Sequence, residues 1–272
     1  MPEQSDYGDI RVQLRDDRVG IITFNRPERL NAFSVQTFAD LECALRWLGS
    51  RTDCGAIVIT GAGQAFSTGM DLRDPLDGAV GEPIQIAYAG LRSAVGSVIA
   101  LREIPQPVIA AVRGHAVGAG FALAAAADIR ICAADALYSA PFVKIGMTVG
   151  DLGLSWLLPR LIGAGSASEL LYTSGTIDAA GAHRLGLAQR VVDDPLGEAI
   201  QLGADIAARP SLAVQMSKEL LNASIGAGGL REHLELELRS QVIGLLTADH
   251  QEARRGFNQR TDSIDFRSTA EA

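Results

Sequence analysis

This sequence is poor in cysteine, and its basic residues are outnumbered by acidic ones. Cys43, Cys54 and Cys132 are the three cysteines among 272 residues, and they fall in no metal-ligand spacing. A disulfide scaffold and a metal site are therefore not expected, and the thiols are expected to be reduced in a cytoplasmic compartment. The 24 Lys and Arg residues against 32 Asp and Glu residues give a net charge of −8, which argues against nucleic-acid and membrane partners.

Long hydrophobic runs are also missing. The longest one lies within residues 116–127 and is too short and too glycine-rich to span a bilayer. The first ten residues are acidic and contain no hydrophobic stretch, so no secretory signal is expected. An apolar fraction of 47% is nevertheless ample for a buried core, and the length fits one large domain or a domain with an appendage.

The first half of the chain alternates short apolar runs with glycine loops and helical periodicity. The β-rich runs at 10–14 and 20–25 predict a hairpin, and the apolar runs at 56–60, 107–112 and 128–133 predict buried strands. This order is typical of an α/β fold whose strands are covered on both faces. In such folds ligands gather where loops leave the carboxyl ends of the strands.

From Leu154 onward the pattern is helical, and the last long helix is expected at about 229–247. Its apolar residues share one stripe, formed by Leu230, Leu234, Leu238, Val242 and Leu245. We therefore expect an α/β core over residues 1–200 and an α-helical region over residues 201–272.

Two glycine loops follow predicted strands, with the sequences AFSTGMD at 65–71 and HAVGAGF at 115–121. Neither has the lysine and hydroxyl spacing of a phosphate-binding loop, and neither matches a dinucleotide fingerprint. Two backbone N–H groups, one from each loop, could instead converge on a carbonyl oxygen that becomes an enolate. The alternative is that the glycines only allow tight turns and close packing.

Five segments resemble the enoyl-CoA hydratase/isomerase, or crotonase, superfamily. The resemblance covers residues 8–257 and is carried by NRPERLNAF at 25–33, AFSTGMDL at 65–72, GHAVGAGFALAAAADIRI at 114–131, KIGMTVGDLGLSWLLPRLIG at 144–163 and SGTIDAAGAHRLGLAQRVV at 174–192. It implies a crotonase-like superhelix of ββα units with an α-helical C-terminal trimerisation region. The assembly it implies is a homotrimer or a dimer of trimers, which is a hexamer.

The resemblance also implies an acyl-CoA substrate and a set of site residues. It assigns the two oxyanion N–H groups to Thr68 and Ala119, with no metal or redox cofactor, because coenzyme A enters as part of the substrate. The residues implied to contact coenzyme A are Arg29, Asn31, Ala32, Ala65, Phe66, Met70, Asp71, Leu72 and Lys218. For Asp71 a structural role in its loop is the alternative, and for Lys218 a solvated helix face.

The chain departs from the hydratases of this family at both catalytic glutamates. Matching the motifs puts Ala122 and Phe142 at those positions, so the usual pair that activates water is missing. Asp151 matches an aspartate that isomerases of the family place in this loop, and Phe142 and Val149 are expected to form an apolar pocket that raises its pKa. A helix cap is the alternative for Asp151. His115, in the second glycine loop, is a further pocket candidate.

Three functions remain open from the sequence. The first is isomerisation of an enoyl-CoA double bond, in which one carboxylate moves a proton between two carbons. The second is a weak or atypical hydratase, and the third is a non-catalytic acyl-CoA-binding protein. The stretch 74–85 is expected to fold over the acyl chain.

Overall fold

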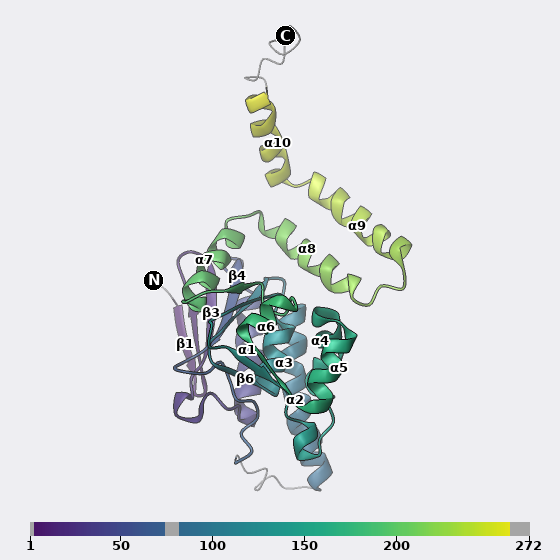
Figure 1. The fold of residues 1–272 in the computed structure, drawn as a ribbon. Coiled ribbons are helices and arrows are strands. Elements are labelled where there is room, and N and C mark those ends of the chain that lie inside the picture. Colours follow the sequence, from purple (N-terminus) through teal and green to yellow (C-terminus); the bar gives the residue numbers. More distant parts are fainter. Residues whose placement is uncertain (1–2, 74–81, 262–272) are drawn as a thin grey trace, which may run out of the picture. The chain divides into compact units, whose positions relative to one another are not determined.

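The computed structural model describes residues 3–73 and 82–261, so most of the stretch expected over the acyl chain lies outside the described residues. The chain divides into two compact units, Met1–Arg209 and Pro210–Ala272. The first unit holds the sheets, and the second holds helices α8 to α10 (Figure 1). The expected boundary at residue 200 falls inside α7 (Pro195–Ala207), a helix of the first unit.

The main sheet of the first unit has seven strands in the order β1-β2-β3-β4-β5-β7-β10. The first three strands are antiparallel, and each later strand is parallel to its neighbour. Their bounds are β1 Glu3–Tyr7, β2 Ile10–Leu14, β3 Val19–Phe24, β4 Ala56–Gly61, β5 Val108–Val112, β7 Ile129–Cys132 and β10 Arg190–Val191. The predicted hairpin and the three predicted buried strands are therefore confirmed.

A second, smaller sheet has the order β6-β8-β9. Its three strands are short, with bounds β6 His115–Val117, β8 Leu137–Ser139 and β9 Thr176–Asp178. The glycine loop at 115–121 thus begins as a strand of this sheet, and β6 is parallel to β8.

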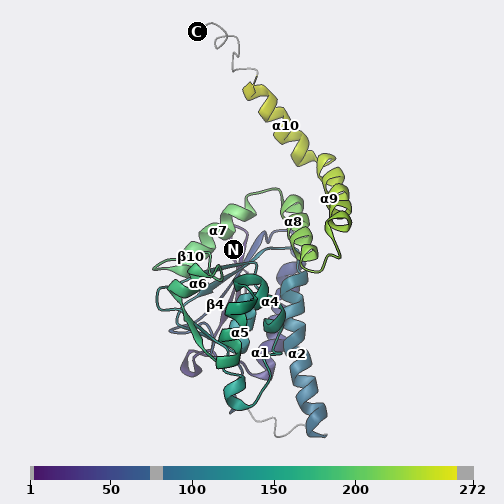
Figure 2. The ribbon, with the colours of Figure 1, turned by 45° about the vertical axis from the view of Figure 1, so that its right-hand side comes forward.

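Helices cover both faces of the main sheet. Alternate strand residues such as Ile57 and Ile59 join one core with α1 (Val35–Gly49) and α3 (Ala119–Ala126), while Val58 joins a second core against α7. Figure 2 shows the strands of the first unit and the helices around them from a second direction. The α/β class is confirmed, because β3, β4, β5 and β7 are buried on both faces, as their apolar runs predict.

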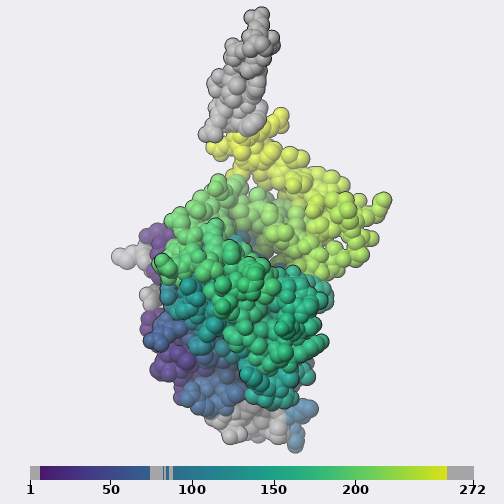
Figure 3. Space-filling view, viewed as in Figure 1, coloured from purple at the N-terminus to yellow at the C-terminus, as the bar shows by residue number. Residues whose placement is uncertain are grey.

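The remaining helices of the first unit are α2 (Pro83–Glu103), α4 (Leu154–Ile162), α5 (Ala164–Thr173) and α6 (Ala179–Arg184), with short 3-10 turns η1 (Pro27–Arg29) and η2 (Val143–Ile145). The second unit contains α8 (Ser211–Ser224), α9 (Leu230–Leu245) and α10 (Ala248–Thr261). Figure 3 shows the residues after β8, in teal and green, covering much of the side of the first unit seen there. None of the helices in the described ranges is long and apolar enough to cross a membrane.

Helix α3 accounts for the alanine-rich stretch in the sequence. All eight of its residues are buried, which is what an apolar surface on every side of a helix requires. It packs against α2, α4 and β6, and its small side chains allow these neighbours to approach closely. The helix begins at Ala119, so its N-terminal end lies in the second glycine loop.

Candidate functional site

The two glycine loops lie side by side in the first unit. The Ser67 N–H donates to the His115 carbonyl at 2.9 Å, and the Val117 N–H donates to the Ser67 carbonyl at 2.9 Å. These bonds make a short parallel bridge between Ser67 and Ala116. The loop that follows β4 is thereby fixed next to the start of α3.

Glycine is required where these backbones meet. A Cβ atom on Gly69 would lie 2.7 Å from the Val117 oxygen and 3.3 Å from the Ala119 nitrogen, and one on Gly120 would lie 2.7 Å from the Ser67 oxygen. Gly69 also has a φ of +85°, which side chains rarely tolerate. The glycines therefore do allow close packing, which was the alternative considered for them. This packing places Gly69 of the first loop beside the Ala119 amide.

The expectation for Thr68 is corrected by its hydrogen bonding. Its backbone N–H donates to the Leu30 carbonyl oxygen at 3.1 Å, on the side away from β6. A donor that is already paired inside the protein has no hydrogen left for a ligand oxygen. Thr68 therefore does not supply an oxyanion N–H in this structure.

Met70 is better placed than Thr68 to offer a free amide. The Phe33 N–H donates to the Gly69 oxygen at 2.7 Å, and the Asp71 N–H donates to the Phe33 oxygen at 2.9 Å. These two bonds form a parallel bridge between Phe33 and Met70. The Met70 N–H consequently points away from Phe33, because N–H groups alternate in direction along an extended segment. Within the described residues it donates to no protein acceptor.

Ala119 supplies a second free amide. It is the first residue of α3, and the N–H groups of a first helical turn have no intrahelical acceptor. No side chain caps this end of the helix. The aligned peptide dipoles add positive potential there, so the amide is suited to an oxygen that gains negative charge.

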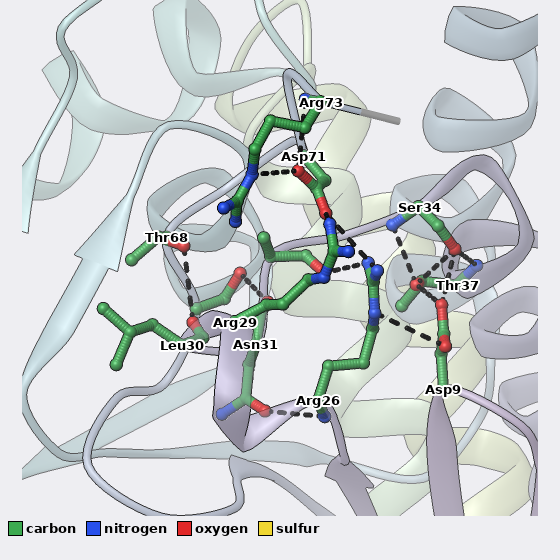
Figure 4. A network of polar contacts seen from close by, with 12 residues as sticks. Asp9, Arg26, Arg29, Leu30, Asn31, Ser34, Thr37, Thr68, Asp71 and Arg73 are labelled. Carbon is green, nitrogen blue, oxygen red and sulfur yellow. Dashed lines mark hydrogen bonds and ion pairs between the residues drawn. The ribbon is translucent and has the colours of Figure 1, made fainter. Parts of the chain in front are cut away.

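Asp71, which follows Met70, is buried beneath three arginines (Figure 4). Its carboxylate accepts hydrogen bonds from Arg26 at 3.3 Å, from Arg29 at 2.8 Å and from Arg73 at 3.5 Å. Burial alone would raise the pKa of Asp71, but the hydrogen bond from Arg29, the Arg73 backbone N–H and the two nearby charges together lower it. The carboxylate stays ionised and holds the arginines in place.

A pocket of about 290 Å³ opens beside this network. It is lined by Glu28, Arg29, Leu30, Ala32, Thr68, Met70, Asp71, Leu72 and Arg73. Five of the residues implied to contact coenzyme A are among them, namely Arg29, Ala32, Met70, Asp71 and Leu72. Arg73 was not foreseen, and no pattern in the sequence distinguishes it.

Three other residues implied to contact coenzyme A do not line this pocket. Ala65 and Phe66 are buried, and the Asn31 amide donates to the carbonyls of Ala62 and Ala65 while its oxygen accepts from the Arg26 N–H. The Asn31 side chain therefore has a structural role, in joining the loop at 25–33 to the loop that follows β4. A contact with coenzyme A at these positions would have to use the backbone.

The two positions that match the hydratase glutamates are apolar and buried. Ala122 is fully buried in α3, and Phe142 is 7% exposed. Val149 is partly buried against the same core. His115, by contrast, is exposed on β6, where its backbone oxygen accepts from Ser67.

Asp151 lies in the loop before α4, and burial raises the pKa of its carboxyl. The helix-cap alternative is wrong, because α4 is capped by Gly153 and no side chain bonds its first turn. The Asp151 backbone oxygen, not its carboxylate, accepts from the Leu154 N–H at 2.8 Å. The Asp151 carboxylate is therefore not used to cap α4 and is available for proton transfer.

Lys218 lies in α8 of the second unit, and its contact with coenzyme A stays a prediction. In the described part of the chain, no group of three or more His, Cys, Asp or Glu side chains could hold a metal ion.

The model of the enoyl-CoA hydratase/isomerase family matches residues 15–266, nearly the whole chain. The chain belongs to the enoyl-CoA hydratase/isomerase family. Among curated relatives, a probable enoyl-CoA hydratase of Mycobacterium tuberculosis, EchA14, is 40% identical over 228 residues, which are 84% of this chain and 87% of the relative. A probable enoyl-CoA hydratase of Mycobacterium bovis, echA12, is 36% identical over 238 residues, which are 85% of this chain and 84% of the relative.

Solved structures of the family share its fold. A probable enoyl-CoA hydratase/isomerase from Mycobacterium abscessus superposes with a TM-score of 0.86 at 33% identity, covering 93% of this chain and 97% of its own. A putative enoyl-CoA hydratase from Streptomyces coelicolor gives a TM-score of 0.88 at 32% identity, covering 95% and 94%. This member of the family therefore shares its mixed α/β fold with these solved structures over 93–95% of the chain.

Proposed function

We propose that this family member is an enoyl-CoA isomerase of fatty acid or related acyl-CoA metabolism. It moves a carbon–carbon double bond from the 3,4 to the 2,3 position of an acyl-CoA thioester. The observation that carries this choice is the replacement of both hydratase carboxylates by buried apolar residues, Ala122 and Phe142. Asp151 then remains as the acid and base, and its raised pKa suits that role.

The thioester oxygen accepts hydrogen bonds from the backbone N–H groups of Met70 and Ala119. This assignment is supported by the absence of an internal acceptor for either amide in the described residues and by the position of Gly69 beside the Ala119 nitrogen. As the enolate forms, negative charge moves onto that oxygen, so both bonds strengthen. Removal of one such donor typically costs about 100- to 1,000-fold in rate.

Asp151 carries the proton. Its carboxylate removes a proton from C2, the electrons of that C–H bond form the C1–C2 double bond, and the thioester oxygen takes the charge. The dienolate then collapses, and the same carboxyl returns the proton to C4, which leaves the double bond between C2 and C3. The transfer is balanced without water, metal or redox cofactor, since coenzyme A enters with the substrate.

The phosphates of coenzyme A bind at the pocket beside Asp71. Arg29 and Arg73 line this pocket and are the more exposed of the three arginines, so they are free to meet a phosphate. Because the chain has a net charge of −8, a local cluster of arginines is the feature that would attract a polyanion. Lys218, in α8, is proposed as an additional contact, and isothermal titration of a Lys218→Ala variant with an acyl-CoA tests it.

A weak or atypical hydratase is the second candidate, and the names of the curated relatives favour it. One assay decides between them. With 3-enoyl-CoA, a gain of absorbance from the conjugated thioester indicates isomerisation, whereas loss of absorbance from 2-enoyl-CoA indicates hydration. Tight binding of coenzyme A esters with neither change would identify a non-catalytic acyl-CoA-binding protein.

The protein assembles as a homotrimer or as a dimer of trimers through its C-terminal helices. The stripe on α9 supports this, because Leu230, Leu234, Leu238, Val242 and Leu245 are all exposed, and a stripe of this size on a single chain favours association. Sedimentation equilibrium gives the number of chains. A monomer at micromolar concentration would contradict the proposal.

A further inference from the structure

Arg26 is the one arginine around Asp71 that does not line the pocket. Its side chain is 16% exposed, whereas those of Arg29 and Arg73 are 41% and 73% exposed. The three arginines share one carboxylate but face different surroundings (Figure 4). A phosphate bound in the pocket would contact Arg29 and Arg73, which line it. Arg26 lies outside the pocket, so its role must be a different one.

The Arg26 guanidinium joins three separate segments of the first unit. It donates to the Ala32 carbonyl at 2.7 Å and to the Asp71 carboxylate at 3.3 Å, and it lies 3.6 Å from the Asp9 carboxylate. Asp9 in turn accepts hydrogen bonds from Ser34 and Thr37 at the start of α1. One side chain therefore links the turn between β1 and β2, the start of α1 and the first glycine loop to the loop at 25–33.

These contacts lie on both sides of the Met70 amide. Ala32 immediately precedes Phe33, and Asp71 immediately follows Met70 in the bridge that sets the direction of the Met70 N–H. Arg26 thus holds one neighbour on each strand of that bridge. Other bonds also join these segments, among them the Arg29–Asp71 pair and the bond from the Thr68 N–H to Leu30. Arg26 adds a side-chain link that ends at the residue before Phe33 and at the residue after Met70.

We propose that Arg26 is a positioning residue that aims the Met70 N–H at the thioester oxygen. The inference rests on the proposed function, because it assumes that Met70 is an oxyanion donor. The planar fork of a guanidinium spreads its N–H donors over three nitrogens and can reach acceptors that lie well apart, whereas a lysine ammonium carries its three N–H groups on one nitrogen. A shift of about 1 Å in such a donor can cost about 100-fold in rate, so the effect belongs to kcat.

The experiment compares Arg26→Gln and Arg26→Lys with the wild type. The control is Arg18→Gln, which removes another partly buried arginine that donates to backbone carbonyls, those of Thr52 and Ala207. For each protein the measurements are kcat and KM with 3-enoyl-CoA, the urea midpoint, and the absorption of bound cinnamoyl-CoA. That absorption shifts to longer wavelength when the thioester oxygen is hydrogen-bonded.

We expect Arg26→Gln to lower kcat about 10- to 100-fold while KM changes less than about threefold, and to reduce the wavelength shift. Arg26→Lys keeps the positive charge and should recover little of the lost kcat or of the lost wavelength shift. It also provides a second variant in case Arg26→Gln does not fold. Arg18→Gln should alter the urea midpoint and leave kcat and the shift as in the wild type.

The inference is overturned if both Arg26 variants keep the wild-type kcat and wavelength shift, even if they unfold at lower urea. It is also overturned if Arg18→Gln lowers kcat equally, since the loss would then be general. A failed proposed function is recognised separately, because the wild type would then neither convert enoyl-CoA nor shift the absorption of cinnamoyl-CoA.

Discussion

The ring of Phe142 faces Gly118, the residue that precedes the Ala119 amide. A Cβ atom on Gly118 would lie 3.7 Å from Cε1 of that ring. Ala122, one turn further along α3, is fully buried. Apolar groups thus occupy both places that match the glutamates of hydratases, next to a backbone amide suited to an enolate.

Installing both carboxylates should create hydration. We expect the double variant Ala122→Glu and Phe142→Glu to hydrate 2-enoyl-CoA at least about tenfold faster than the wild type, because a carboxylate pair can activate water. Burying a charge in α3 should also lower the free energy of unfolding by several kcal/mol. The single variants are the controls. A wild type that hydrates as fast as the folded double variant would contradict the prediction.

Ala119→Pro should remove the amide without breaking α3. Proline is tolerated at the first position of a helix because the N–H there has no helical partner. We expect kcat/KM for isomerisation to fall about 100- to 1,000-fold, with the circular dichroism spectrum and urea midpoint close to those of the wild type.

The matched control is Ala164→Pro. Ala164 is the first residue of α5, is also preceded by a glycine, and is exposed. The isomerase activity of the Ala164→Pro variant should stay within about twofold of the wild type. If both proline variants lose activity alike, the loss does not come from the Ala119 amide.

Asp151→Asn should abolish isomerisation and leave the affinity for acyl-CoA nearly unchanged. In the wild type kcat should rise with pH as the carboxyl deprotonates, and this rise should lie above the usual range of an aspartate because burial raises the pKa of Asp151. A pH–rate profile and isothermal titration with an acyl-CoA test both parts. An active asparagine variant would remove Asp151 from the mechanism.

The same substitution should stabilise the fold at neutral pH. The pKa of Asp151 is higher in the folded than in the unfolded chain, so its favourable contribution is full below the unfolded pKa and is lost as the pH rises through the folded value. Above that value the folded protein keeps a partly buried charge. Urea unfolding at pH 7 should show a more stable Asp151→Asn variant, and the difference should vanish in acid.

Arg130→Met should be strongly destabilising. The buried Arg130 guanidinium donates to the carbonyls of Ala127 and Leu187 at 2.6 Å, and to further carbonyls at the end of α3. Burial lowers the pKa of Arg130 to about 10, so the group is charged at pH 7. Loss of these partners should cost about 3–5 kcal/mol of unfolding free energy.

The control for Arg130 is Arg46→Met, which removes an exposed arginine paired with Glu42. Exposed pairs contribute about 1 kcal/mol or less. Equal urea midpoints for the two variants would show that the carbonyl network around Arg130 contributes little.

Much of the main sheet could be predicted from the sequence, because β2 alternates apolar and polar residues and β3, β4, β5 and β7 are short, largely apolar runs. The small sheet could not, since β6, β8 and β9 have three residues each and such lengths carry no periodicity. Helix α3 also shows no helical period, because it is buried all round.

Of the two donors predicted from the sequence, the structure corrects Thr68, and Ala119 stays a prediction. Ala119 was assigned from its motif, and the structure leaves its N–H at the start of a helix. The assignment of Thr68 failed because the direction of an N–H group in this loop depends on pairing with Leu30 and Phe33, which lie far away in the sequence. For the same reason Arg26, whose partner Asp71 lies 45 residues away, could not be distinguished from other arginines in the sequence.

Because α3 has no face in contact with water, its first turn cannot fray or reorient without disturbing the core around it. The helix end that would receive the enolate oxygen is therefore in its final orientation before any substrate arrives. The free energy needed to orient these peptide dipoles is supplied when the chain folds. No reorientation of the helix is needed in each catalytic cycle.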